Sequence, residues 1–233
     1  MTRSQRATLS AREPAGIRLY FKQAPVSSLG PGKRAVIWTQ GCPFRCDGCI
    51  SPDSLDPEGG EEVSVDSLVA WILEHTGIEG LTISGGEPFL QARQIAQLID
   101  RLKSQRDLGV ICYTGYTMDH LVAEGSAAQK DLLKRLDLLI DGPYIRSLHA
   151  DLYLRGSANQ RLLTLTERYR DLIADIQNAG DKGCGLEIIV APGGQVCVAG
   201  VPMEPDFRDN LNSALQDTNS NTRTEQEGTI NAR

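Results

Sequence analysis

The chain has 233 residues, 40% of them hydrophobic, and a formal net charge of −6 at pH 7. This length and apolar content suffice for one hydrophobic core. The acidic balance argues against a nucleic-acid partner, because phosphate-binding surfaces need clustered Lys and Arg. No run approaches the roughly 18 apolar residues of a membrane span, and the polar start has no apolar signal segment. We therefore expect a cytoplasmic protein with reduced thiols and no membrane association.

The first predicted elements are short strands. Residues 1–16 carry Ser, Arg and Thr without periodicity, and we expect a flexible leader there. Residues 17–21 predict a strand. A Gly-Pro-Gly turn at 30–32 then leads into a second, apolar strand at 34–39.

A cysteine-rich loop follows the second strand. Cys42, Cys46 and Cys49 are separated by three and two residues, and Gly41 and Gly48 let the backbone fold tightly around them. Structural zinc is closed by four ligands, and an iron–sulfur cluster usually has four cysteines. Three nearby thiolates therefore indicate a metal centre with one open position. The alternatives are a zinc site completed by a distant His or Cys, and three unligated thiols.

Beyond this loop the pattern alternates between helices and strands. Residues 51–62 are rich in Pro, Asp, Gly and Glu and predict a surface loop, after which Ser64 can cap a helix. The predicted elements are a helix at 65–75, a strand at 80–84, a helix at 92–106, a strand at 109–113 and a fourth strand within 136–144. Such crossovers build a parallel sheet with reactive loops at the carboxyl ends of its strands.

The loop Gly85, Gly86, Glu87 and Pro88 comes directly after the strand at 80–84. Its glycines permit close approach of a ligand. Its carbonyl oxygens and carboxylate can receive an ammonium group. The structural alternative is a turn with a helix start, since Pro is common at a first helical position.

The two motifs in this order resemble the radical S-adenosylmethionine superfamily. The resemblance implies an α/β fold of the partial (β/α) barrel type, a [4Fe-4S] cluster on Cys42, Cys46 and Cys49, and S-adenosyl-L-methionine chelated at the fourth iron. The implied chemistry is reductive cleavage of that cofactor to a 5′-deoxyadenosyl radical. Asp141, at a strand end facing the same mouth, is expected to touch the ribose or a partner. The residues implied to bind the cofactor are Gly48, Ile50, Gly85, Gly86, Glu87, Pro88 and Asp141.

Three further stretches, at 113–116, 136–144 and 154–161, resemble the activases of glycyl radical enzymes, especially those of anaerobic ribonucleoside-triphosphate reductase. The resemblance implies a glycyl radical enzyme as partner and a low-potential electron donor such as flavodoxin or ferredoxin. The polar run 154–161 can also bind phosphate or cap a helix. Cys112, Cys184 and Cys197 form no second cluster pattern, so we expect free thiols.

Two positions depart from the expected patterns. Gly48 stands where many superfamily members carry an aromatic residue, although glycine is common there in the ribonucleotide reductase activators. The run at 50–52 replaces the aromatic or His followed by Asn that is usual in the activases, which bears on the substrate more than on the cofactor. A small-molecule enzyme resembling 7-carboxy-7-deazaguanine synthase and a noncatalytic cluster-bearing redox module are the alternatives. The intact loop at 85–88 argues against the second.

The resemblance covers 17–161, and the chain continues beyond it. A helix is predicted at 165–178, and apolar runs at 186–190 and 195–201 flank a Pro-Gly-Gly turn, which predicts a hairpin. Polar residues without periodicity follow, and we expect them to be disordered. The predicted organisation is a leader at 1–16, a radical S-adenosylmethionine core at 17–161, a helix and hairpin extension at 162–203 and a disordered tail at 204–233.

Overall fold

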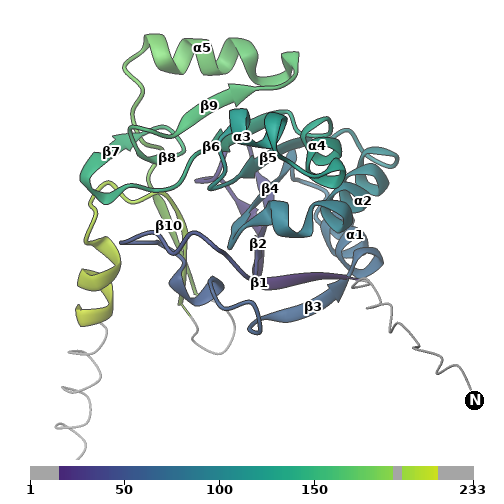
Figure 1. Ribbon diagram of the computed structural model, residues 1–233, viewed down its shortest axis with the longest axis horizontal. Coiled ribbons are helices and arrows are strands. Elements are labelled where there is room, and N and C mark those ends of the chain that lie inside the picture. Colours follow the sequence, from purple (N-terminus) through teal and green to yellow (C-terminus); the bar gives the residue numbers. More distant parts are fainter. Residues whose placement is uncertain (1–15, 191–195, 215–233) are drawn as a thin grey trace, which may run out of the picture.

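The computed structural model describes residues 16–190 and 196–214 and contains a seven-stranded sheet in the order β3-β1-β2-β4-β5-β6-β9 (Figure 1). β2, β4, β5 and β6 are parallel neighbours, whereas β1, β3 and β9 pair antiparallel at its two sides. The strands are β1 (Gly16–Val26), β2 (Arg34–Thr39), β3 (Glu61–Ser64), β4 (Gly80–Gly85), β5 (Gly109–Tyr113), β6 (Leu138–Asp141) and β9 (Arg161–Thr164). The α/β class predicted from the sequence is confirmed.

The parallel strands form the core because they are buried on both faces. β2 is buried at every position, and its Ile37 lies opposite Ile83 of β4. Ile83 in turn lies opposite Cys112 of β5, which lies opposite Leu139 of β6. Such continuous apolar strands are typical of parallel sheets with both faces covered. The carboxyl ends of these strands share one edge of the sheet, so the loops that follow them meet there.

Helices lie on both faces of the sheet. They are α1 (Val65–Glu74), α2 (Ala92–Lys103), α3 (Met118–Ala123), α4 (Ala127–Leu133) and α5 (Arg170–Asn178), of which α1, α2 and α4 lie together on one side (Figure 1). α5 packs on the face opposite α1, α2 and α4. Ser64 caps α1 as predicted, because its hydroxyl accepts a hydrogen bond from the Ser67 N–H. α2 buries Ile95 and Leu98 in the core. Within 16–190 and 196–214 no helix has the length and hydropathy needed to cross a bilayer.

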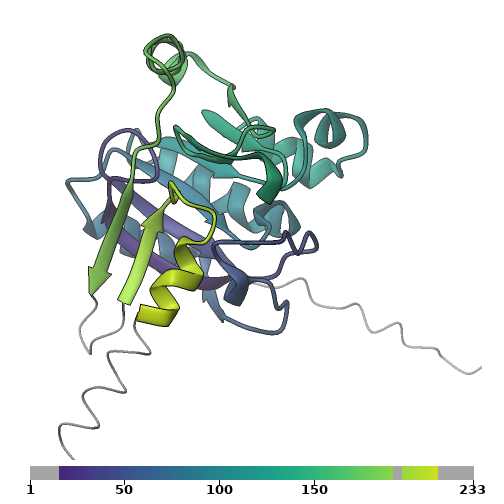
Figure 2. The ribbon, with the colours of Figure 1, turned by 90° about the vertical axis from the view of Figure 1, so that its left-hand side faces the viewer.

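A C-terminal hairpin covers the other face of β2. It consists of β10 (Leu186–Val190) and β11 (Val196–Gly200), which stand beside the sheet in Figure 2. Ile189 and Ala199 of the hairpin pack in one apolar cluster with Val36 and Trp38. Both hairpin strands lie where the sequence predicts them. The predicted turn at 192–194 lies outside the described residues.

Three segments differ from the expectation. β3 includes residues 61 and 62, for which the sequence predicts a loop. The prediction is wrong because this polar edge strand has no alternation of apolar residues. The predicted polar loop 154–161 contains β8 (Arg155–Ser157), which pairs with β7 (His149–Leu152), and the first residue of β9. Residues 207–214 are helical, although a disordered tail was predicted from 204 onward. Tertiary contacts hold this helix, and a polar composition does not reveal them.

Residues 1–15 and 215–233 lie outside the described part of the chain.

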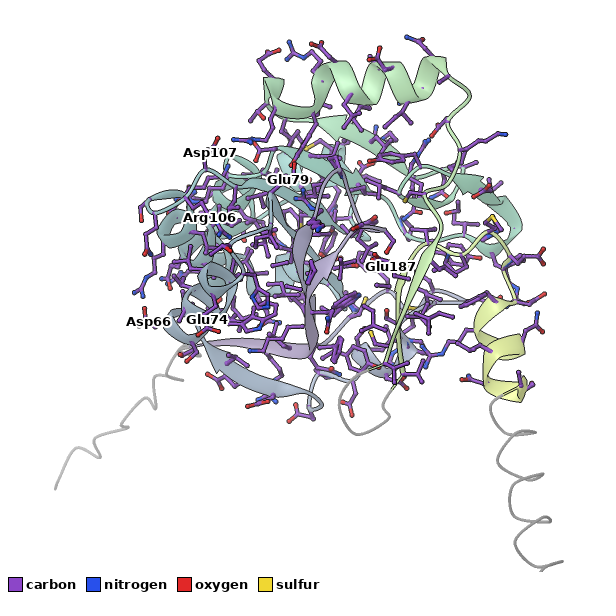
Figure 3. All side chains as sticks on the ribbon, turned by 180° about the vertical axis from the view of Figure 1, so that it is seen from behind. Asp66, Glu74, Glu79, Arg106, Asp107 and Glu187 are labelled. Carbon is purple, nitrogen blue, oxygen red and sulfur yellow. The ribbon has the colours of Figure 1, made fainter. Side chains whose placement is uncertain are left out.

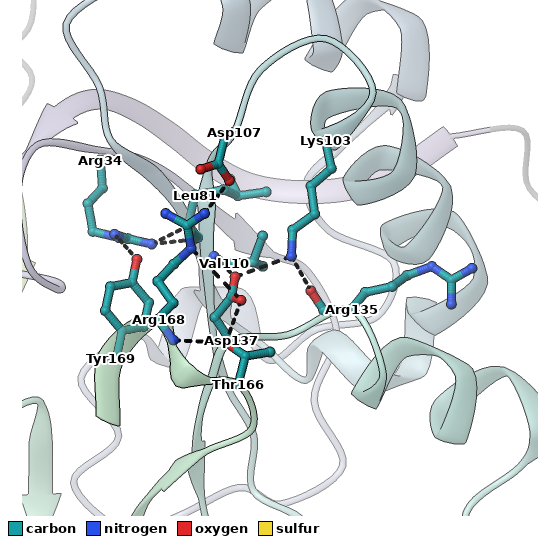
Figure 4. A network of polar contacts seen from close by, with 11 residues as sticks. Arg34, Leu81, Lys103, Asp107, Val110, Arg135, Asp137, Thr166, Arg168 and Tyr169 are labelled. Carbon is teal, nitrogen blue, oxygen red and sulfur yellow. Dashed lines mark hydrogen bonds and ion pairs between the residues drawn. The ribbon is translucent and has the colours of Figure 1, made fainter. Parts of the chain in front are cut away.

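A buried arginine joins the amino ends of three parallel strands. Arg34, at the start of β2, is fully buried, and its guanidinium donates to the carbonyl oxygens of Leu81 (2.8 Å) and Gly109 (2.7 Å). It also donates to the hydroxyls of Thr82 (2.6 Å) and Tyr169 (3.1 Å), as Figure 4 shows for Tyr169. All of these acceptors are uncharged oxygens, so the cation is stabilised by hydrogen bonds to β4, β5 and the segment before α5.

A buried carboxylate lies beside this arginine and ties down the start of β6. Asp137 accepts hydrogen bonds from the Val110 N–H (2.8 Å), the Lys103 ammonium (3.2 Å) and the Thr166 hydroxyl (2.8 Å), as drawn in Figure 4. Together the two groups fix the end of the sheet opposite the reactive loops. The loops at the carboxyl edge are therefore built on a rigid base.

We expect Arg34→Met to lower the free energy of unfolding by about 3 kcal/mol, because it leaves buried carbonyl and hydroxyl oxygens without their donor. Arg170→Met is the matched control. Arg170 is exposed and pairs with Glu167 at the surface, so its loss should cost less than about 1 kcal/mol. Urea unfolding of the full chain measures both variants. Equal, small losses would show that the buried arginine does not hold the strands together.

Candidate functional site

The cysteine loop and the loop after β4 enclose one cavity at the carboxyl edge of the sheet. We call this cavity, about 140 Å³ in volume, the cluster cavity. Cys42, Cys46 and Cys49 all line it, and each is a free, partly buried thiol. Gly85 and Glu87 line it from the side of β4. The structure therefore brings together the two motifs that the sequence singled out.

Backbone hydrogen bonds hold the two loops against each other. The Gly86 N–H donates to the Thr39 carbonyl oxygen (2.7 Å), and the Glu87 N–H donates to the Gly41 carbonyl oxygen (2.7 Å). A Cβ added to Gly86 would lie 2.3 Å from that Gly41 oxygen, a distance that no real side chain tolerates. Gly85 has a φ of +96°, in the region that favours glycine. The two glycines are therefore needed for the loops to touch.

The donor set fits an iron–sulfur cluster. In a [4Fe-4S] cluster each cysteine binds a different iron, so three thiols around a cavity suit such a cluster without converging on one point. In the described part of the chain no three His, Cys, Asp or Glu side chains are grouped as the ligands of a single metal ion. Burial raises the pKa of all three thiols. Bound iron would supply the positive charge that deprotonates them.

Glu87 lies at the centre of a small buried network. Its carboxylate accepts hydrogen bonds from the N–H of Phe89 (2.9 Å), the hydroxyl of Thr114 (2.8 Å) and the N–H of Gly115 (2.8 Å). Burial raises the pKa of Glu87 to about 7, because these hydrogen bonds offset only part of the desolvation. The carboxylate thus links the loop after β4 to the loop after β5. That it also receives an ammonium group stays a prediction.

Pro88 and Asp141, which the resemblance also implies in cofactor binding, make other contacts in the structure. Pro88 begins the short 3-10 helix η2 (Pro88–Gln91). The loop is therefore also a turn with a helix start, which was the structural alternative to cofactor binding. The buried Asp141 carboxylate accepts hydrogen bonds from the Arg161 guanidinium and the Met118 N–H, whereas the next residue, Gly142, lines the cluster cavity. A contact of Asp141 with the ribose therefore stays a prediction and would compete with these partners.

Gly48 and Ile50 line a second cavity, about 170 Å³ in volume, which we call the outer cavity. It adjoins the cluster cavity, because both are lined by Cys46, Cys49, Ser84, Tyr113, Tyr144 and Gln160. Gly48 has a φ of +75°, and a Cβ there would lie 3.2 Å from the Tyr144 ring. The glycine that departs from the superfamily pattern is therefore suited to the fold of this loop.

Residues that the sequence did not assign also line the cluster cavity, among them Phe44, Thr114, Tyr144 and Gln160. Thr114 follows β5 directly, and its position after a parallel strand is the signal that would have found it. Gln160 belongs to the run 154–161, whose role was left open. Its amide accepts from Gly156 and donates to Gly142, so it braces the cavity wall.

Titration of Glu87 should make the stability of the cluster-free protein depend on pH. Its pKa in the folded protein, about 7, lies above the ordinary value of 4.5, so folding takes up a proton between these values. The free energy of unfolding should therefore fall as pH rises from about 4.5 to about 7, by up to ~3 kcal/mol from this group. Glu87→Gln should remove that slope, and the exposed Glu58→Gln should keep it. Urea unfolding between pH 5 and 8 checks this, and equal slopes in both variants would refute it.

Comparisons with known proteins agree with this geometry. The family model described as "4Fe-4S single cluster domain" matches residues 28–163, more than half of the chain. The anaerobic ribonucleoside-triphosphate reductase-activating protein of Enterobacteria phage T4 is 30% identical over 59% of this chain and 88% of its own length. The protein of the same name from Vibrio cholerae is 34% identical over 60% of this chain and 94% of its own length.

Two more distant matches complete the comparison. The pyruvate formate-lyase-activating enzyme of Clostridium pasteurianum is 33% identical over 48% of this chain and 45% of its own length. The crystal structure of QueE from Escherichia coli aligns with a TM-score of 0.38 and 16% identity over 54% of this chain and 71% of that chain. A likeness of that size carries no argument about function. The family model and the activating proteins show that this chain belongs to the radical S-adenosylmethionine family of glycyl radical enzyme activases, built on a 4Fe-4S single cluster domain.

Proposed function

We propose that this protein cleaves S-adenosylmethionine reductively and installs a glycyl radical on a partner enzyme such as anaerobic ribonucleoside-triphosphate reductase. The observation that carries the proposal is the cluster cavity, where three free thiols and the Gly85–Gly86 backbone face one space. The names of the relatives support the partner class, because two of them activate that reductase. A cytoplasmic location and a flavodoxin or ferredoxin as electron donor are part of the proposal.

The residues of the cavity divide into two groups. Cys42, Cys46 and Cys49 would hold the cluster, whose chemistry, when reduced, is to give one electron to the bound sulfonium so that a carbon–sulfur bond breaks. The loop from Gly85 to Pro88 would hold the methionyl end of the cofactor. Thr114 and the Gly115 N–H would keep Glu87, and with it that loop, in place.

The first experiment tests the cluster ligands. Anaerobic reconstitution should give four irons and four sulfides per chain, and Cys42→Ala, Cys46→Ala or Cys49→Ala should abolish this. Cys112→Ala, Cys184→Ala and Cys197→Ala are matched controls, because none of these thiols lines the cluster cavity. Iron and sulfide analysis of the six variants decides. Full cluster content in Cys46→Ala would remove this loop as the ligand set.

The second experiment tests the reaction. The reduced protein should convert S-adenosylmethionine to 5′-deoxyadenosine, and chromatography of the products measures it. Added reductase should acquire a glycyl radical, which electron paramagnetic resonance detects. Cleavage without transfer to any glycyl radical enzyme would favour the small-molecule alternative. No cleavage by cluster-loaded protein would favour the noncatalytic redox module.

A further inference from the structure

The C-terminal extension lies beyond the matched family region, which ends at residue 163. We use this name for the hairpin of β10 and β11 together with residues 201–214, of which 207–214 are helical. Glu187 of β10, labelled in Figure 3, accepts hydrogen bonds from the N–H of Ser27 (2.8 Å) and the hydroxyl of Ser28 (3.0 Å). The start of the extension is therefore fixed to the turn between β1 and β2.

The cysteine loop is held unevenly by the rest of the domain. At its start the Cys42 N–H donates a hydrogen bond to the Leu55 carbonyl oxygen (3.1 Å). Between residues 43 and 50 of the described chain, the backbone-to-backbone hydrogen bonds reduce to one, from the Cys49 N–H to the Cys46 carbonyl oxygen (3.2 Å). This bond lies within the loop. The half of the loop that carries the last two cysteines therefore depends on side chains for its position.

The extension contacts that half of the loop through Arg208. The Arg208 guanidinium donates to the Ile50 carbonyl oxygen (2.7 Å) and to the Asp53 carboxylate (2.5 Å). One arginine can hold two oxygens at once because its guanidinium is a planar fork of donors. Ile50 directly follows Cys49, so this contact fixes the backbone beside the last cysteine.

A second arginine lies against the loop between the last two cysteines. The Arg146 guanidinium pairs with the Asp206 carboxylate of the extension and lies 4.0 Å from the Asp47 carboxylate of the loop. A Cβ added to Gly48 would lie 3.3 Å from the same guanidinium, so the arginine packs closely on the loop backbone. Asp206 thus holds Arg146 in place against the loop.

We propose that the C-terminal extension is a brace that keeps the last two cysteines of the loop in position for the cluster, with Arg208 and Asp206 as its positioning residues. Arg208 acts through the Ile50 backbone, and Asp206 acts through Arg146. A cluster held by three cysteines loses most of its protein ligands when two of them move. The brace therefore sets how long iron is retained, which goes beyond the proposed function because it does not concern the radical reaction.

Arg208→Met tests the brace in the cluster-loaded protein. Both donors are lost, so iron should pass to a ferrous chelator about fivefold faster than from the wild type, as expected for one charged contact at a partly exposed site. Absorbance of the iron chelate under argon gives the rate. Arg101→Met is the matched control. Arg101 pairs with Asp66 at the surface between α2 and α1, so its loss should leave the rate unchanged.

Alkylation of the cluster-free protein tests the brace without iron. Trypsin cuts after Arg45, which separates the peptide with Cys42 from the peptide with the other two cysteines of the loop. Mass spectrometry after iodoacetamide labelling therefore measures the two halves of the loop separately. In Arg208→Met the second peptide should be labelled several-fold faster. Cys42 should keep its wild-type rate, because its contact with Leu55 remains.

Arg146→Met removes the second contact and should change both measurements in the same direction. Wild-type rates of iron loss and labelling in Arg208→Met would overturn the inference and leave the proposed function intact. Equal acceleration at all three cysteines would also overturn it, because the loss of Arg208 would then have loosened the whole loop. A wild-type protein that binds no cluster would instead overturn the proposed function, and the labelling of the cluster-free protein would still test the brace.

Discussion

The parallel register of β2 and β4 is the constraint on which the site depends. It places Thr39 opposite Gly85, so the two strands end at the same level of the sheet. The loops that follow therefore start side by side, and the hydrogen bonds from Gly86 to Thr39 and from Glu87 to Gly41 close the gap between them. A shift of one residue in this register would turn every buried side chain to the other face. Core packing thereby fixes the distance between the cysteine loop and the glycine loop.

Most of this arrangement follows from local pattern. The run 80–84 is apolar and bounded by glycines, Ser64 stands where a helix cap belongs, and the cysteine spacing is specific. Once these elements are known, the parallel arrangement of the strands follows from the rule that strand–helix–strand crossovers are right-handed. For these reasons the parallel strands β2, β4, β5 and β6, the helices α1 and α2 and the meeting of the two motifs could be predicted, whereas the antiparallel strands β3 and β9 were not. Cys42, Cys46 and Cys49 lie in one cavity because their loop directly follows a parallel strand, as the glycine loop does.

The remainder could not be predicted because it depends on contacts between distant residues. Thr114 and Gly115 bind Glu87 across 27 and 28 residues of sequence, and nothing near Thr114 signals a buried carboxylate. From the sequence, Arg34 is expected to be an exposed polar residue at the end of a strand. In the structure it is fully buried, because Tyr169, 135 residues away, covers it. The 207–214 helix has a polar composition typical of disorder. Its contacts are with residues far away in the sequence, such as that of Arg208 with Asp53, 155 residues away.

The two ends of the parallel sheet have opposite roles, and the extension joins them. At the amino ends, Arg34 and Asp137 use buried hydrogen bonds to hold the strands still. At the carboxyl ends, glycines and partly buried thiols leave open space. The hairpin is fixed by Glu187 to the turn between β1 and β2, and from there the chain reaches across to Ile50 at the open edge. This path ends one residue after Cys49, where Arg208 contacts Ile50 and Asp53. The same contact therefore couples the position of the extension to the position of the cysteine loop.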